Sequence, residues 1–179
     1  MLSNPMPKSI IGAKMKFEVV DYTTFFRDSI KADSKLTPDI IEKAYSEVEI
    51  PTRKTSGSAG YDFICPYDIL LAPGGVAKIP TGIKAQMDKD VVLLMFVRSS
   101  IGINRRMAFP NGTAVIDSDY YGNPDNEGDI MLVLVNNNEY DVKVFAGERV
   151  AQGVFVNYLL TDDDASDGTR TGGIGSTDG

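Results

Sequence analysis

The sequence contains no histidine, and its only cysteine among 179 residues is Cys65. The absence of histidine excludes the side chain most often used as a general base and as a metal ligand. A single cysteine excludes an intrachain disulfide and a cysteine-rich zinc site. Any chemistry must therefore come from carboxylates, hydroxyls and arginines, with an oxygen-seeking cation where one is needed.

The sequence also lacks an excess of positive charge and any long apolar run. Eighteen Lys and Arg stand against 25 Asp and Glu, so the formal net charge is -7. Nonspecific electrostatic binding to nucleic acid or to an anionic membrane is therefore not expected. Any bound anion must be bound by a few donor groups close to it. No stretch approaches the roughly 20 apolar residues of a membrane helix, and the first residues lack the apolar core of a signal peptide. We expect a cytoplasmic protein.

With 42% hydrophobic residues, the chain is long enough to bury a core as one domain. Residues 14–20 read as an early strand. Residues 36–48 read as the one convincing helix, with Thr37 as its cap and Pro38 in its first turn. At helical spacing one face of this helix would carry Ile41, Ala44, Tyr45 and Val48.

From Tyr61 onward, short apolar segments alternate with turn residues, which is typical of an antiparallel sandwich or barrel. The run Val91–Val97 has no polar residue, which predicts a strand buried on both faces. After Leu160 the apolar signal stops and residues 161–179 form an acidic linker and a Gly-rich tail. The expected strands read YDFICP, DILLAP, VAKIPTGIKAQM, VVLLMFV, AVI, IMLVLVN, YDVKVF and VAQGVFVNYLL.

Three polar segments are candidate sites, and each also has an ordinary structural interpretation. Arg98, Ser99 and Ser100 follow the apolar run and offer a guanidinium fork and two hydroxyls to a phosphate, or they simply end a strand. The small-residue turn 57–62 leads into Asp62, which suits a hydrated magnesium ion, or it is a plain Asp turn.

The third segment is Phe109–Asp117, where Asn111-Gly112 predicts a hairpin with exposed backbone groups at its tip. Asp117 lies at the end of the second arm and would activate a water molecule within hydrogen-bond reach. The alternative for Asp117 and Asp119 is a solvated turn. The tail, TRTGGIGSTDG, cannot fold by itself, but its N-H and O-H groups and Arg170 suit a strap over a polyanion.

Five segments occur in one order along the chain: SGSAGYD, RSS, NGTAVIDSDY, GERVAQ and RTGGIGSTD. Together they closely resemble the five motifs of the trimeric deoxyuridine triphosphatases, from about Lys14 to the C-terminus. The resemblance implies a mainly β fold, a β jelly roll of the β-clip type, over residues 1–160, with one inserted helix at about 21–46. It also implies a homotrimer with shared active sites, over which the flexible tail 161–179 closes.

The resemblance further implies hydrolysis of dUTP to dUMP and pyrophosphate with Mg²⁺, which limits uracil in DNA and supplies dUMP for dTMP synthesis. Asp117 matches the general base that activates water for attack on the α-phosphorus, and Asp62 would place the Mg²⁺ through water. The base and the deoxyribose would be bound by Asn111, Gly112, Val115, Ile116, Tyr120, Met131 and Ile174. The phosphates would be bound by Arg98, Ser99, Ser100, Gln152, Arg170, Gly175, Ser176 and Thr177.

Two departures and two alternatives accompany this resemblance. Ile174 stands where the family carries an aromatic residue over uracil, and the insertions 21–46 and 123–128 have no assigned role. The related dCTP deaminases place a glutamate in the strand after the catalytic turn, whereas residues 130–136 contain no acidic residue. A nucleotide-dependent regulatory protein on the same fold, docking a partner at the insertions, is the other alternative.

Overall fold

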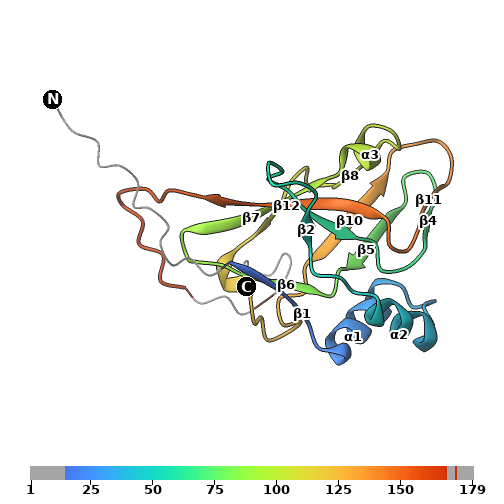
Figure 1. Cartoon of the computed structure of the whole chain (residues 1–179), viewed down its shortest axis with the longest axis horizontal. Coiled ribbons are helices and arrows are strands. Elements are labelled where there is room, and N and C mark those ends of the chain that lie inside the picture. Colours follow the sequence, from blue (N-terminus) through green and yellow to red (C-terminus); the bar gives the residue numbers. More distant parts are fainter. Residues whose placement is uncertain (1–14, 169–171, 173–179) are drawn as a thin grey trace.

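The computed structural model describes residues 15–168 and residue 172. It is mainly β, as predicted, and all its strand pairs are antiparallel. The largest sheet has the order β2-β3-β12-β7-β9, and three smaller sheets have the orders β5-β10-β8, β1-β6 and β11-β4 (Figure 1). The strands are β1 Lys16–Val19, β2 Thr52–Arg53, β3 Tyr61–Ile64, β4 Ile69–Leu71, β5 Val76–Pro80, β6 Ile83–Gln86, β7 Val91–Val97, β8 Met107–Ala108, β9 Ala114–Ile116, β10 Met131–Asn136, β11 Val142–Val144 and β12 Arg149–Asn157.

The apolar segments predicted as strands are confirmed, because each contains one strand or, in the case of residues 76–87, the two strands β5 and β6. Side chains of the central strands alternate between buried and less buried positions. β7 follows this alternation up to Met95, so the prediction that it is buried on both faces is wrong for the single chain. Val91, Leu93 and Met95 are buried on one face, and the remaining residues of the strand are half-buried. An unbroken apolar run does not reveal which of its faces is covered.

The prediction of a single inserted helix is also wrong, because two helices lie side by side after β1, namely α1 Tyr22–Ala32 and α2 Pro38–Ser46 (Figure 1). α2 matches the predicted helix, with Thr37 at the N-cap position. α1 was missed although an apolar stripe at helical spacing marks it, formed by Tyr22, Phe25, Phe26 and Ile30. Its buried face also carries the polar residues Thr24, Asp28 and Ser29.

The two helices share a small hydrophobic core of their own, separate from the main core between the sheets. Phe25 and Ile41 are fully buried there, and Tyr67 from the β framework completes it. α1 also packs against β5. The inserted helices are therefore attached to the β framework by buried side chains.

The hairpin predicted at Asn111-Gly112 does not form. Gly112 lies in a turn, with a positive φ of 73° and its N-H bonded to the Phe109 carbonyl at 3.0 Å. However, β8 before the turn pairs with β10, and β9 after it pairs with β7. The Asn-Gly signal identified the turn, but it does not say which strands pair with the two arms.

Two further features concern the single cysteine and the length of the helices. Cys65 is buried, and burial raises the pKa of its thiol to about 12, so it is no thiolate nucleophile. Across the described part of the chain, no helix has both the length and the apolar character to span a bilayer.

Candidate active site

The expected phosphate-binding residues gather where β3, β12 and β7 lie next to one another. Asp62 on β3 is the cross-strand partner of Gln152 on β12, and Arg98 directly follows β7. One guanidinium nitrogen of Arg98 lies 3.2 Å from the Asp62 carboxylate, and one of Arg149 lies 3.7 Å from the same oxygen. The antiparallel register therefore brings together residues that are up to 90 positions apart, as 62 and 152 are.

A cavity of about 490 Å³ opens at this place, lined among others by Asp62, Arg98, Gln152 and the backbone of Gly60. Gly60 fits only because it has no side chain: an added Cβ would lie 2.6 Å from the Gln152 side-chain oxygen. The Gly-Ser-Ala-Gly turn thus lets the backbone form one wall of the cavity. Lys54 adds a second cation to its lining.

Ser99 and Ser100 begin the short helix α3, Ser99–Gly102, immediately after Arg98. Both serines are exposed, while the Arg98 side chain keeps about 30% of its surface open. The motif predicted from sequence therefore presents two hydroxyls and one guanidinium at the same end of β7. This set of donors is suited to a polyanion.

The expected base-binding and catalytic residues flank β9. The Asn111-Gly112 turn precedes the strand and is exposed, and Asp117 follows it and is exposed as well. Within the strand, Val115 is 57% exposed while Ile116 is buried. The backbone at the turn and the carboxylate after the strand are therefore both accessible to a ligand.

Tyr120 closes the short 3-10 helix Ser118–Tyr120 that follows Asp117, and it is 5% exposed. Its hydroxyl donates a hydrogen bond to the Asp129 carbonyl oxygen at 3.1 Å and accepts one from the Asn126 side-chain amide at 2.8 Å. Tyr120 and Met131 line one cavity of about 220 Å³, together with Asp28 and Lys31 of α1. The two residues expected near the sugar are thus brought together.

Within one chain, Asp117 and the residues expected to bind phosphate lie apart. Ile116, the residue before Asp117, pairs with Leu93, whereas Arg98 follows at the far end of β7. Arg98 lies five positions beyond Leu93, which is about 17 Å at the usual rise per residue. A single bound nucleotide triphosphate would not bring Asp117 and Arg98 of the same chain into one reaction centre.

Two buried carboxylates behind Tyr120 were not predicted from the sequence. Asp129 is fully buried and accepts a hydrogen bond from the Gly82 N-H at 2.9 Å. Burial, and then the charge of Asp28, raises the pKa of Asp129 well above its usual range, and burial also raises the pKa of Asp28. One oxygen of each carboxylate lacks a hydrogen-bond partner.

Of residues 169–179, only Gly172 is described; it is buried, and its carbonyl accepts a hydrogen bond from the Asn123 side chain at 2.9 Å. Gly172 therefore contacts the segment that follows Asp117 and the 3-10 helix Ser118–Tyr120. The predicted site residues Arg170, Ile174, Gly175, Ser176 and Thr177 lie outside the described residues.

Within residues 15–168, no group of three or more histidine, cysteine or acidic side chains could hold a metal ion alone. A cation at Asp62 would depend on water and on the ligand's own phosphates for its remaining contacts. Magnesium tolerates this arrangement because it usually keeps several waters and takes only one or two carboxylates.

A dUTPase family profile matches residues 46–177, from the last residue of α2 to near the C-terminus. A relative from Lactococcus lactis, named deoxyuridine 5'-triphosphate nucleotidohydrolase, is 44% identical over 132 residues. That alignment covers 73% of this chain and 88% of the relative.

Solved structures give the same match. The crystal structure of dUTPase from Streptococcus mutans superposes with a TM-score of 0.63 at 33% identity, covering 82% of this chain and 98% of that one. A mutant dUTPase from phage phi11 of S. aureus, whose structure is described as coordinating a structural Mg(II) ion, has a TM-score of 0.57 at 19% identity. It covers 68% of this chain and 91% of its own.

Proposed function

Because the chain belongs to the dUTPase family, we propose that it hydrolyses dUTP to dUMP and pyrophosphate. The observation that carries the proposal is the placing of an exposed carboxylate, Asp117, directly after the strand β9, whose preceding turn offers backbone groups to a base. Asp117 deprotonates the water that attacks the α-phosphorus. Without histidine in the sequence, a carboxylate is the natural candidate for this role.

Recognition of the nucleotide is divided between the two ends of the site. The backbone from Asn111 to Ile116 reads the edge of uracil: cytosine offers the wrong donors, and the methyl group of thymine is crowded out. Tyr120 packs under the deoxyribose beside Met131, where a ribose 2'-hydroxyl finds no room. The buried ring of Tyr120 and its two hydrogen bonds support this role, since they fix its position.

The phosphates bind to Arg98, Ser99, Ser100 and Gln152, in the cavity next to Asp62. Arg98 has five N-H donors, and its contact with Asp62 leaves donors free for a phosphate. Asp62 holds Mg²⁺ through water, and the ion, when bound, offsets the developing charge on the phosphate oxygens. In the tail, Arg170, Gly175, Ser176 and Thr177 complete the set of phosphate donors, and Ile174 covers the base.

The working unit is a homotrimer in which each site combines Asp117 of one subunit with Arg98 of another. The separation of about 17 Å along β7 supports this assembly, because one chain alone does not bring the base and the phosphate-binding arginine together. Residues 1–160 form the β domain of each subunit, and the tail 161–179 closes over a site as a lid.

The substitution Asp117→Asn tests the role of this carboxylate. It removes the base and keeps the shape, so kcat should fall by several orders of magnitude while the affinity for dUTP stays within about tenfold. The matched control is Asp119→Asn, which neutralises a second exposed carboxylate two residues further along. Near-normal kcat for Asp117→Asn, or an equal loss in the control, would remove Asp117 from the mechanism.

A further inference from the structure

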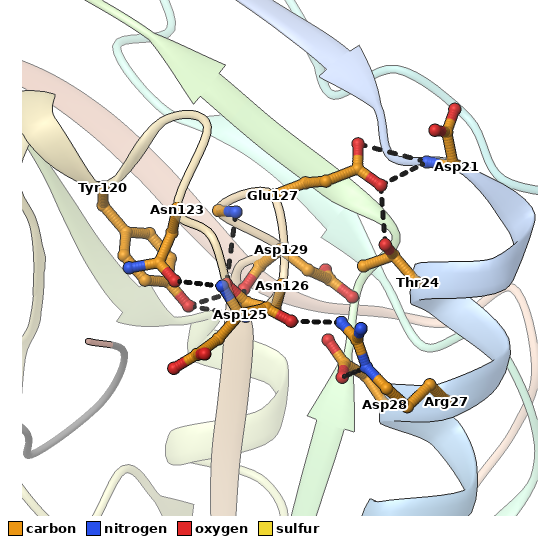
Figure 2. A network of polar contacts seen from close by, with 11 residues as sticks. Asp21, Thr24, Arg27, Asp28, Tyr120, Asn123, Asp125, Asn126, Glu127 and Asp129 are labelled. Carbon is orange, nitrogen blue, oxygen red and sulfur yellow. Dashed lines mark hydrogen bonds and ion pairs between the residues drawn. The ribbon is translucent and has the colours of Figure 1, made fainter. Parts of the chain in front are cut away.

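The two segments without an assigned role, helix α1 and the loop 123–128, contact each other across about 100 residues of sequence. The loop residue Glu127 reaches the N-terminus of α1, where its carboxylate accepts a hydrogen bond from the Thr24 hydroxyl at 2.6 Å (Figure 2). It also accepts from the Asp21 N-H at 3.3 Å and from the Lys84 ammonium at 2.8 Å. Three donors from two different elements therefore converge on one loop carboxylate.

The backbone of Glu127 supports the view that this contact is specific. Its φ is 58°, a left-handed conformation that a residue with a side chain adopts at a cost. Such a conformation persists when the surroundings over-determine it, and here the three donors do so. The charge is retained as well: burial opposes it, but the hydrogen bonds from Lys84 and Thr24 lower the pKa of Glu127.

The loop is closed on itself and tied to α1 at a second point. Backbone hydrogen bonds join the Gly122 N-H to the Glu127 carbonyl at 2.9 Å and the Glu127 N-H to the Asn123 carbonyl at 2.7 Å. Arg27 of α1 donates to the Asp125 carbonyl (Figure 2). The position of α1 is therefore transmitted to the whole loop, because the loop has little freedom to deform between these contacts.

The loop also restricts the position of Tyr120, because its residue Asn126 contacts the Tyr120 hydroxyl. The Asn126 amide donates to the Tyr120 hydroxyl at 2.8 Å and to the Asp129 carbonyl at 3.2 Å, the same carbonyl that accepts from Tyr120. In Figure 2 the Asn126 and Asp125 side of the loop lies between the Tyr120 ring and α1. A continuous series of hydrogen bonds thus leads from α1 through the loop to the residue beneath the sugar.

We propose that the loop 123–128, clamped by α1, is a positioning element that fixes Tyr120 and thereby sets the discrimination between deoxyribose and ribose. The inference rests on the proposed function of Tyr120 at the dUTP site. A ring held in place leaves no room for a 2'-hydroxyl, whereas a ring free to shift makes room for one. In this proposal Asn126 and Thr24 are positioning residues, since both act through Tyr120.

The test compares kcat/KM for dUTP and UTP in wild-type protein and in variants that break the series at two places. Asn126→Ala removes the contact with Tyr120, and Thr24→Val removes the hydroxyl that holds Glu127 while keeping the side-chain volume. The ratio of kcat/KM for dUTP to that for UTP should fall about tenfold in Asn126→Ala, the worth of one well-made hydrogen bond, and several-fold in Thr24→Val. Thr24→Ser keeps the hydroxyl and should keep the wild-type ratio.

Glu127→Gly provides a second route in case Thr24→Val does not fold. It removes the carboxylate, and glycine adopts the positive φ without strain, so the loop can keep its path. In Glu127→Gly the ratio of kcat/KM for dUTP to that for UTP should fall as much as in Thr24→Val. The KM for UTP should change more than the kcat for dUTP. An unchanged ratio in both Asn126→Ala and Glu127→Gly, with dUTP hydrolysis intact, would overturn the inference alone. Failure of wild-type protein to hydrolyse dUTP would overturn the proposed function and the inference with it.

Discussion

At the scale of single residues, the buried carboxylate of Asp129 is the clearest departure from an ordinary surface acid. It is fully buried two residues before β10, the charge of Asp28 on α1 acts on it, and one of its oxygens has no hydrogen-bond partner. Two buried acids close together favour a bound proton, because burial and the neighbouring charge both penalise ionisation. The stability of the protein should therefore depend on pH through this residue.

The pH dependence has a definite sign. The pKa of Asp129 is raised in the folded protein, so its favourable contribution to stability is fully present below the unfolded pKa of about 4 and is lost as the pH rises through the folded pKa. Asp129→Asn keeps an oxygen for the Gly82 N-H and does not titrate. Urea unfolding from pH 4 to 8 should show wild-type stability declining relative to this variant. A parallel pH dependence in both proteins would contradict the assignment.

At the scale of elements, the inserted helices are held by a core of their own. Phe25 and Ile41 are fully buried between α1, α2 and the β framework, and Tyr67 contributes from the other side. Gly82 also has to be small here, because an added Cβ would meet the Phe25 ring at 3.2 Å, and its φ is 71°. The insertion is therefore part of the folded unit and not a loosely attached addition.

The prediction at this scale is that Phe25→Ala lowers the free energy of unfolding by about 3–5 kcal/mol, the cost of emptying a buried aromatic position. Ile40→Ala on α2 is the matched control, because Ile40 is 44% exposed and should change stability little. Urea denaturation of both variants measures the difference. A loss of less than about 1 kcal/mol in Phe25→Ala would show that the insertion core contributes little.

The strands could be predicted from the sequence because apolar segments and turn residues are local signals. α1 was missed although Phe25, Phe26 and Ile30 lie at helical spacing, a signal that was present in the sequence. The Asn111-Gly112 turn was found, but its strands pair with β10 and β7, which a local signal cannot reveal. Motif order predicted the grouping of Asp62, Arg98 and Gln152. The contact of Glu127 with Thr24 was not predictable, because nothing near either residue indicates its distant partner.

At the scale of the whole molecule, the separation of Asp117 from Arg98 calls for an assembly. A trimer that shares its sites would take one residue from each of two subunits. Gel filtration with light scattering should therefore give three times the mass of the 19.5 kDa chain.

Complementation between inactive variants tests the shared site directly. Asp117→Asn and Arg98→Ala should each be inactive alone. Each mixed trimer formed by coexpression contains one site in three with both wild-type residues. A random 1:1 population, which also contains inactive homotrimers, should therefore recover about a quarter of wild-type activity. Mixed trimers without activity, shown by light scattering to have assembled, would mean that each site is built within one chain.

The most direct test of the central claim is pyrophosphate release by wild-type protein from dUTP, dCTP, dTTP and UTP at equal concentration. The account predicts rapid release from dUTP and release from the other three lower by at least about 100-fold, because each of them presents a wrong donor, a methyl group or a 2'-hydroxyl to the site. Ammonia release from dCTP would indicate a deaminase. Nucleotide binding without any pyrophosphate release would indicate a regulatory protein, and either result would contradict the account.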